Sequence, residues 1–490
     1  MRRVAVARLA AAALSWPALA HAHSFGKLYN LPVPFWMYVW GAAGALLVSF
    51  LVVGWFVTRP AAAVAPASRE IGIGLRRRWL QRVRALAIAQ GLSLAMLALC
   101  VATGLLGTRN PYLNFNMTFF WIVFVLGFTY ACALVGDWYA VLSPWRLLTQ
   151  GVGPRSTGWF AGRRPYPAAW GVWPALVLYF AFIWLELFGR LKPFSLAVAL
   201  LAYAAITLAG AWTFGAAAWL RHGEFFAVFL RLVAKMAPLA VEPAAAPGEP
   251  LRLRWRVPFA GLLESQAQGR SEVVFVLFML SSTAYDGLHA TAPWSRLFWV
   301  DVYHALQPWV GANIVQAYPI LLKVNLAWET TALLLSPFAY LAAYLLALWL
   351  AKVITRSPLS VHELSLRFAY SLLPIALVYN VTHYWTLIVT QGTQIVRLAS
   401  DPFGYGWDLF GTARFLPLPI IPDMGIVWHT QVGLILLGHV VSVVIAHLEA
   451  LRVFGDRRRA TLSQVPMLGL MVLFTTVGLW ILAQPIQGGR

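Results

Sequence analysis

One polar pattern occurs twice in the stretch TAYDGLHATAPWSRLFWVDVYH at 283–304. Asp286 is followed three residues later by His289, and Asp301 is followed three residues later by His304. On a helix, three residues correspond to about 300° of rotation, so each Asp shares a face with its His. Such a pair can bind a metal ion or act as an oriented acid/base unit. The spacing is equally compatible with structural His–carboxylate pairs or with loop residues in water.

The composition indicates that these pairs belong to a membrane protein. Of the 490 residues, 60% are hydrophobic and 11% are charged, whereas a soluble domain has about 25% charged residues. Long, continuous apolar runs predict an all-α fold, a polytopic integral membrane helical bundle, because helices satisfy their own backbone in lipid. Alternating patterns would indicate a barrel, and they are absent. The lipid bilayer is therefore the main expected partner.

Two other features of the composition argue against a nucleic-acid-binding protein and against a disulfide-rich or CxxC-type protein. The net charge of +20 does not predict nucleic acid as a partner, because most Lys and Arg fall in predicted loops and suit membrane anchoring. Cys100 and Cys132 both fall inside predicted spans, so neither a disulfide framework nor a CxxC site is expected.

The domain organisation is a cleavable signal peptide at 1–22 followed by a single transmembrane domain at 23–490. Arg2 and Arg3 precede an apolar core, and small residues follow it, as in secretory signals. A signal retained as an additional span would leave the later orientation unchanged. Ten spans are predicted after the signal: 33–57, 85–106, 117–136, 172–189, 194–219, 272–290, 329–352, 369–390, 425–450 and 466–485.

Basic residues orient these spans with both the mature N-terminus and the C-terminus outside. The predicted cytoplasmic loops, with Lys352 at an edge, hold 25 Lys and Arg, against 9 in exterior segments and 3 in the signal. This asymmetry follows the positive-inside rule. It predicts a multi-pass protein of a bacterial inner membrane. Two cytoplasmic segments, 137–148 and 223–239, are predicted to lie along the membrane surface, and 312–328 is not expected to form an extra span.

Polar side chains gather at the exterior ends of the sixth to ninth predicted spans, which would face the periplasm. The candidate metal ligands are Asp286, His289, Asp301, His304, His383 and His429, and the first four are also the candidate catalytic residues. A catalytic zinc takes three protein ligands and one water, and two metals can clamp a phosphoryl group. A divalent metal ion is therefore expected if these span ends converge.

A second set of polar residues lies deeper in the predicted bundle. Glu186 falls near the end of the fourth span, and His439 and His447 fall in the ninth. Intramembrane groups of this kind can relay protons, or they can hydrogen-bond to a neighbouring helix. Haem is not expected, because His439 has no second mid-membrane His as a partner.

Three segments resemble a family of bacterial membrane proteins known as fenitrothion hydrolases. They are HSFGKLYNLPVPFWMYVWGAAGALLVSFLVVG at 23–54, GDWYAVLSPWRLL at 136–148 and FMLSSTAYDGLHATAPW at 278–294. The chain departs from the family pattern in having Ser24 after His23, where the family has Gly, and Ser143 where it has Asn. The resemblance implies hydrolysis of an apolar organophosphorus triester such as fenitrothion, with release of a nitrophenol.

The mechanism attached to this resemblance is a hypothesis about the exterior polar residues. A metal held by His289, His304 and one or both of Asp286 and Asp301 would activate water for attack on phosphorus. His383 or His429 would complete the coordination or carry a proton. Nearby aromatic residues would hold an aryl ester or anchor the protein at the interface; they are Trp294, Trp299, Tyr303, Trp309, Tyr384 and Trp385.

Two other functions fit the same residues. A proton-coupled or other small-molecule transporter would use the intramembrane acid and His residues as a relay. A membrane maturation protein would bind copper or haem at the exterior His set. The sequence indicates no particular protein partner.

Overall fold

The computed structural model describes residues 33–58, 69–70, 76–150, 158–242, 252–311, 313–415 and 423–484. The predicted signal peptide at 1–22 lies outside the described residues. The predicted fold class is confirmed: within the described segments, nine helices are long and apolar enough to cross a membrane. These helices are α2 (Phe35–Phe56), α3 (Arg76–Leu106), α4–η1–α5 (Phe115–Val135), η2–α9 (Ala168–Leu187), α10 (Pro193–Phe214), α16 (Ile314–Thr355), α17–α19 (Val361–Ser400), α20 (Met424–Phe454) and α21 (Arg457–Ala483).

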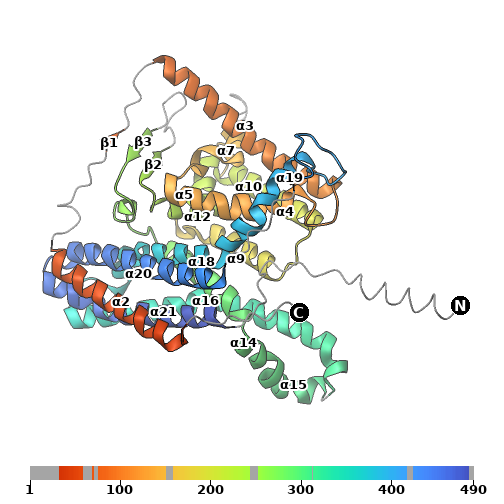
Figure 1. The fold of residues 1–490 in the computed structure, drawn as a ribbon. Coiled ribbons are helices and arrows are strands. Elements are labelled where there is room, and N and C mark those ends of the chain that lie inside the picture. The colour runs from red at the N-terminus through yellow and green to blue at the C-terminus, as the bar shows by residue number, and fades with distance from the viewer. Residues whose placement is uncertain are drawn as a thin grey trace.

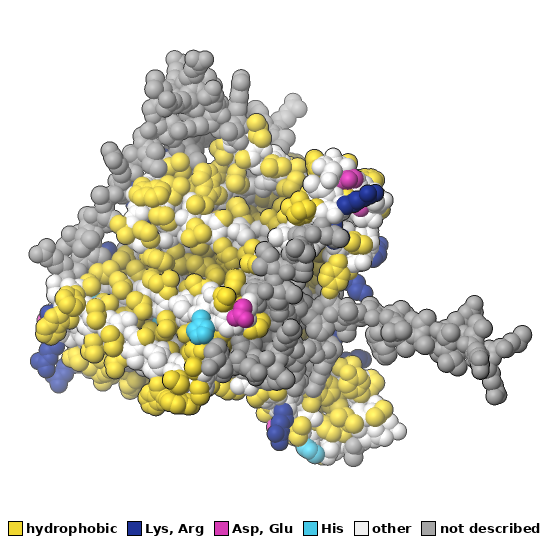
Figure 2. Space-filling model, viewed as in Figure 1, with side chains coloured by type: hydrophobic (Ala, Val, Ile, Leu, Met, Phe, Trp, Pro, Cys, Tyr) yellow, Lys and Arg dark blue, Asp and Glu magenta, His cyan; other side chains and the backbone are white. Residues whose placement is uncertain are grey.

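The surface of the bundle is suited to lipid. Figure 2 shows hydrophobic side chains over most of the described face, with Lys and Arg near its edges. Large side chains point outward along the helices, and Trp40 and Trp55 are each 72% exposed. An apolar surface this extensive would drive aggregation in water, so it supports a multi-pass position in a membrane.

Helix α13 (Arg270–His289) occupies the centre of the bundle and ends at the candidate site. It corresponds to the predicted sixth span and lies outside the set of nine. Thirteen consecutive residues, from Ser271 to Thr283, are buried, because α9, α16 and α18 (Leu373–Gln391) surround the helix. A helix that is buried on all sides is positioned by protein contacts rather than by lipid.

Helix α16 begins earlier than the predicted span at 329–352. It has 42 residues, a length of roughly 63 Å at 1.5 Å per residue, and its first turns extend beyond the bundle. Three short elements pack beside this extension through aromatic and apolar contacts: α14 (Ala292–Arg296), η4 (Leu297–Val302) and α15 (Tyr303–Val310). We call these elements and the first turns of α16 the projecting hairpin. Figure 1 shows this projecting hairpin on the side of the molecule away from the sheet.

The opposite end of the bundle carries a small antiparallel sheet. Its strands are β1 (Arg69–Glu70), β2 (Leu239–Glu242) and β3 (Arg252–Trp255), in the order β1-β3-β2. Arg254 pairs with Ala240 in β2 and with Glu70 in β1. Other short elements are α6 (Tyr139–Leu142), α7 (Pro144–Gln150), α11 (Ala216–His222), α12 (Phe225–Ala234), η3 (Ala260–Leu262), η5 (Ala369–Leu372) and η6 (Gly392–Gln394).

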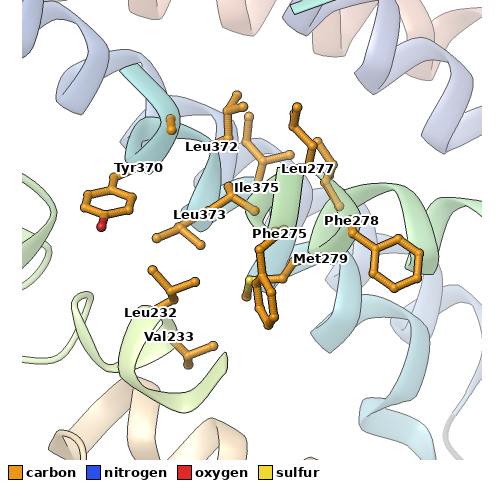
Figure 3. Close-up of a cluster of buried hydrophobic side chains, with 14 of the residues drawn as sticks. Leu232, Val233, Phe275, Leu277, Phe278, Met279, Tyr370, Leu372, Leu373 and Ile375 are labelled. Atoms are coloured by element: carbon orange, nitrogen blue, oxygen red, sulfur yellow. The ribbon is translucent and has the colours of Figure 1, made fainter. Parts of the chain in front are cut away.

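Helix α12 packs into the core rather than along the membrane surface, so the surface position predicted for 223–239 was wrong. Leu232 and Val233 lie opposite Phe275 of α13, and η5 and α18 complete the cluster (Figure 3). Leu232 is 0% exposed and Val233 is 1% exposed. The apolar face of α12 therefore buries against protein, and its basic end reaches the side of the molecule that bears the sheet.

A close helix crossing gives a test of this packing. A Cβ at Gly104 of α3 would lie 2.5 Å from the Pro193 carbonyl oxygen and 2.6 Å from Ala197 Cβ. Gly104→Ala should therefore destabilise the protein by about 1–3 kcal/mol, as overpacking does. Thermal unfolding in detergent measures the effect. Gly91→Ala is the matched control, because nothing lies within 4 Å of its Cβ on the same helix. Equal melting temperatures for the two variants would contradict the packing.

Candidate functional site

Asp286, in the last turn of α13, is the centre of a buried polar cluster. Its side chain is 3% exposed. One carboxylate oxygen, Oδ1, lies 3.5 Å from His289 Nε2, so the predicted pairing across one helical turn is present. The other, Oδ2, lies 2.8 Å from His383 Nε2 and accepts a hydrogen bond of 2.6 Å from the Tyr384 hydroxyl. Two imidazoles and a phenol thus surround one carboxylate.

Glu186 provides a second carboxyl group beside the same phenol. It lies in the last turn of α9, and the Tyr384 hydroxyl interacts with both Glu186 and Asp286. A phenol has one proton to donate. Tyr384 donates that proton to Asp286, so its hydroxyl hydrogen is not available to Glu186. The phenol therefore lies near two carboxyl groups, a grouping that can hold a proton.

A small internal cavity lies next to these acids. Its volume is about 40 Å³, which is space for about three water molecules at roughly 10–15 Å³ each. Its polar lining includes Ser282, Thr283 and Asn380, and Asn380 Oδ1 accepts a 3.0 Å hydrogen bond from the Tyr130 hydroxyl. Aromatic side chains close the remaining sides; they are Tyr179, Phe182, Phe225, Phe226 and Phe229.

Next to this cavity, the helical structure is interrupted inside the bundle. After α10, helix α11 packs back along α10, where a Cβ at Gly210 would lie 2.2 Å from the Trp219 ring. Gly223 and Glu224 then form a turn, and α12 starts at Phe225. This is a helical hairpin with its turn inside the protein. Interrupted helices of this kind occur in membranes where they line a cavity or are enclosed by protein.

Glu224 occupies the turn of this hairpin and is 0% exposed. Its carboxylate accepts hydrogen bonds from the backbone N–H groups of Phe226 (3.2 Å) and Ala227 (2.7 Å). The hydroxyls of Tyr139 (3.4 Å) and Tyr203 also donate to it. Because Tyr203 is halfway along α10 (Pro193–Phe214), Glu224 lies at the middle of that span.

Glu224 also lies between two cavities. Its neighbours Phe225 and Phe226 line the small cavity, whereas Tyr139 and Ala227 line a second cavity of about 440 Å³ at the end of the bundle that carries the sheet. Polar groups therefore lie on both sides of the Phe225 and Phe226 rings, with Asp286 at the small cavity and Glu224 between these rings and the large cavity. Glu224 is not among the residues predicted from the sequence, although an acid in the N-cap position before the apolar run FFAVFL was an available signal.

The structure places the other predicted site residues elsewhere. Asp301 and His304 are exposed on the projecting hairpin. His429 is exposed near α2, where its ring nitrogens lie 2.7 Å from the Gly425 carbonyl oxygen and 3.4 Å from the Tyr38 hydroxyl. Of the six predicted ligands, only Asp286, His289 and His383 come together. In the part of the chain that the structure describes, no group of three or more His, Cys, Asp or Glu is arranged to hold a metal ion.

The deep His residues of α20 make structural contacts. His439 Nδ1 lies 2.8 Å from the Ile435 carbonyl oxygen of the preceding turn. His447 Nε2 lies 3.0 Å from the Val57 carbonyl oxygen, and its Nδ1 lies 2.8 Å from Gln464 Nε2. These contacts join α20 to the end of α2 and to α21, away from the cluster around Asp286.

Comparison of the chain with protein families, with curated proteins and with solved structures finds no match.

Proposed function

We propose that this protein is a proton-coupled membrane transporter whose proton path runs from Asp286 to Glu224. The observation that carries the proposal is the position of Glu224, a buried acid at the turn of an interrupted helix, between a cavity that contains Asp286 and a larger cavity at the other end. Ionisable residues inside a membrane domain are costly, and they commonly mark ion or proton paths.

The order of groups suggests how a proton would move. His289 is the most accessible member of the cluster, with a side chain 21% exposed, and Asp286 lies between it and His383. Tyr384 then connects Asp286 to Glu186, and waters in the small cavity would continue the path toward Glu224. The rings of Phe225 and Phe226 close the cavity at that point. Their displacement would connect the two cavities, as a gate does in alternating access.

The orientation of the protein in the membrane follows from its basic residues. Following the Lys and Arg distribution, the projecting hairpin of α14 and α15 would face the periplasm of a bacterial inner membrane. The sheet and the large cavity would face the cytoplasm. Protons would then enter through the cluster around Asp286, down the gradient that bacteria maintain.

A second candidate is the hydrolase that the resemblance implies. The Asp286–His383 contact of 2.8 Å supports it, because a carboxylate that orients a His is a common general-base arrangement. Asp286, His289 and His383 are the predicted ligands that come together, but within the described residues they are not arranged to hold a metal ion, so this candidate rests on the Asp–His contact. The cavity accommodates water but is too small for an aryl phosphate triester, so this candidate requires the bundle to open.

Proton flux in proteoliposomes tests the first candidate against the second. Protein would be reconstituted around a trapped pH-sensitive dye, and gradients of sodium, acetate, inorganic phosphate and an amino-acid mixture would be imposed in turn, each with and without a membrane potential. We expect at least one gradient to change the internal pH, and empty liposomes to remain constant. Release of nitrophenol from fenitrothion without any proton movement would contradict transport and favour the hydrolase.

A further inference from the structure

The large cavity at the end with the sheet is built from several separate elements. Residues from α6, α7, α11, α12, β2 and β3 line it, and its volume of about 440 Å³ lies within the range of small-molecule sites. The floor is apolar and includes Leu220, Ala227 and Leu239. The polar lining consists of six basic side chains and three carboxylates: Arg146, Arg221, Arg231, Lys235, Arg254 and Arg256, with Asp137, Glu242 and Glu264.

Two of the arginines are neutralised and have a structural role. Arg254 lies 2.9 Å from Glu264 and 3.6 Å from Glu242. Arg256 lies 3.2 Å from Glu264 and donates to the carbonyl oxygens of Ala234 (2.7 Å) and Ala237 (2.9 Å). These contacts hold β3 against the end of α12 and form one wall of the cavity.

The remaining basic side chains of the lining, Arg146, Arg221, Arg231 and Lys235, outnumber the remaining acid, Asp137. Arg146 donates to the Ala140 carbonyl oxygen at 2.5 Å, and Lys235 donates to the Ser265 hydroxyl at 2.6 Å. Arg221 of α11 and Arg231 of α12 make no hydrogen bond or ion pair with any residue in the described ranges. Neither guanidinium group has an ion-pair partner among the described residues: Arg221 is exposed, and Arg231 interacts with Asp137 only at longer range. The cavity wall therefore carries more positive than negative charge, and guanidinium groups suit a negative ligand such as phosphate.

Burial shifts the pKa of two lining groups toward the neutral form, but the basic side chains still outnumber the carboxylates. It raises the pKa of Asp137 to about 6, with the Ala140 N–H, Arg231 and Arg146 opposing the rise. It lowers the pKa of Lys235 to about 8, so this amine keeps its charge at neutral pH. The cavity is therefore positively charged under physiological conditions.

We propose that this cavity binds a phosphate group, through Arg221 and Arg231, with the apolar floor holding the organic part of the same molecule. Two sources share this chemistry: a soluble organic phosphate and the headgroup of an anionic lipid, since basic pockets between membrane helices bind such headgroups. The site is separate from the acids of the proton path, and its binding can be measured whether or not protons move.

Equilibrium binding to the full-length purified protein tests the site. Glycerol 3-phosphate and inorganic phosphate would be titrated in detergent, with sodium chloride at equal ionic strength as the blank. In a second arm, nanodiscs of phosphatidylcholine would be compared with nanodiscs that contain phosphatidylglycerol, with bound lipid counted by native mass spectrometry. We expect saturable binding in one arm, and the arm in which it occurs identifies the source.

The variant Arg221→Gln/Arg231→Gln should weaken that binding by about tenfold or more, as loss of hydrogen bonds between charged groups does. Neither arginine makes a hydrogen bond or an ion pair within the described residues, so the variant breaks no direct contact and should fold, and Asp137 keeps the favourable charge of Arg146. Arg458→Gln is the matched control, an exposed arginine of α21 outside the cavity. Absence of binding in both arms would overturn the proposal, and so would equal affinity for the double variant and the control.

Discussion

Asp286→Asn is expected to slow proton movement in proteoliposomes by about 10²- to 10⁴-fold, the usual contribution of a positioned proton carrier. Asparagine has nearly the same shape as aspartate and fills the same buried space among His289, His383 and Tyr384. It cannot take up or release a proton, and it removes the negative charge that both imidazoles face. The initial rate of internal pH change, under the gradient that drives the wild-type protein, measures the effect.

Asp301→Asn is the matched control for this prediction. Asp301 has the same residue type and the same spacing to a His, but it is exposed on the projecting hairpin. Its replacement should leave the rate within about twofold of wild type. If the two variants lose activity equally, or if neither loses any while both insert normally, the cluster around Asp286 is not the proton site.

Glu224→Gln should abolish coupled proton movement while leaving most of the fold intact. The glutamine carbonyl oxygen can still accept hydrogen bonds from the start of α12, so the N-cap is partly retained. The amide NH₂ cannot carry a proton between the two cavities. The NH₂ group would also replace a carboxylate oxygen that accepts hydrogen bonds, so it would face other donors. We therefore expect the free energy of unfolding to fall by about 1–3 kcal/mol. Proton flux and thermal unfolding, measured on the same preparation, separate the two effects.

Glu272→Gln provides a control in which another buried, hydrogen-bonded carboxylate is replaced by an amide, with a similar expected loss of stability. Glu272 is 5% exposed, accepts a 3.0 Å hydrogen bond from the Tyr370 hydroxyl, and accepts another of 2.8 Å from the backbone N–H of Gln268. Its environment thus resembles that of Glu224, but it lines neither cavity. A similar loss of stability with normal proton flux in Glu272→Gln would show that the effect at Glu224 is specific. Normal flux in Glu224→Gln would disprove the path.

The amino-acid sequence by itself determined the class of the protein and one local pairing. Continuous apolar runs require helices in lipid, because the backbone has no other hydrogen-bond partners there, and the all-α bundle follows from them. Asp286 and His289 are three residues apart on one helix, so their contact depends only on helical geometry. This contact requires only that one helix include both residues, and α13 does so.

Only the tertiary structure decided which of the equivalent candidates share a site. Asp301 and His304 have the same spacing as the first pair, yet they lie on the projecting hairpin, while His383, nearly one hundred residues further along the chain, reaches Asp286. The burial of α12 and the central position of Glu224 could not be predicted from the sequence either. The physical reason is that lipid-facing and protein-facing surfaces of a membrane protein are both apolar. Hydropathy therefore does not distinguish a helix that lies along a membrane from one enclosed by its neighbours, and only the packing of distant helices does.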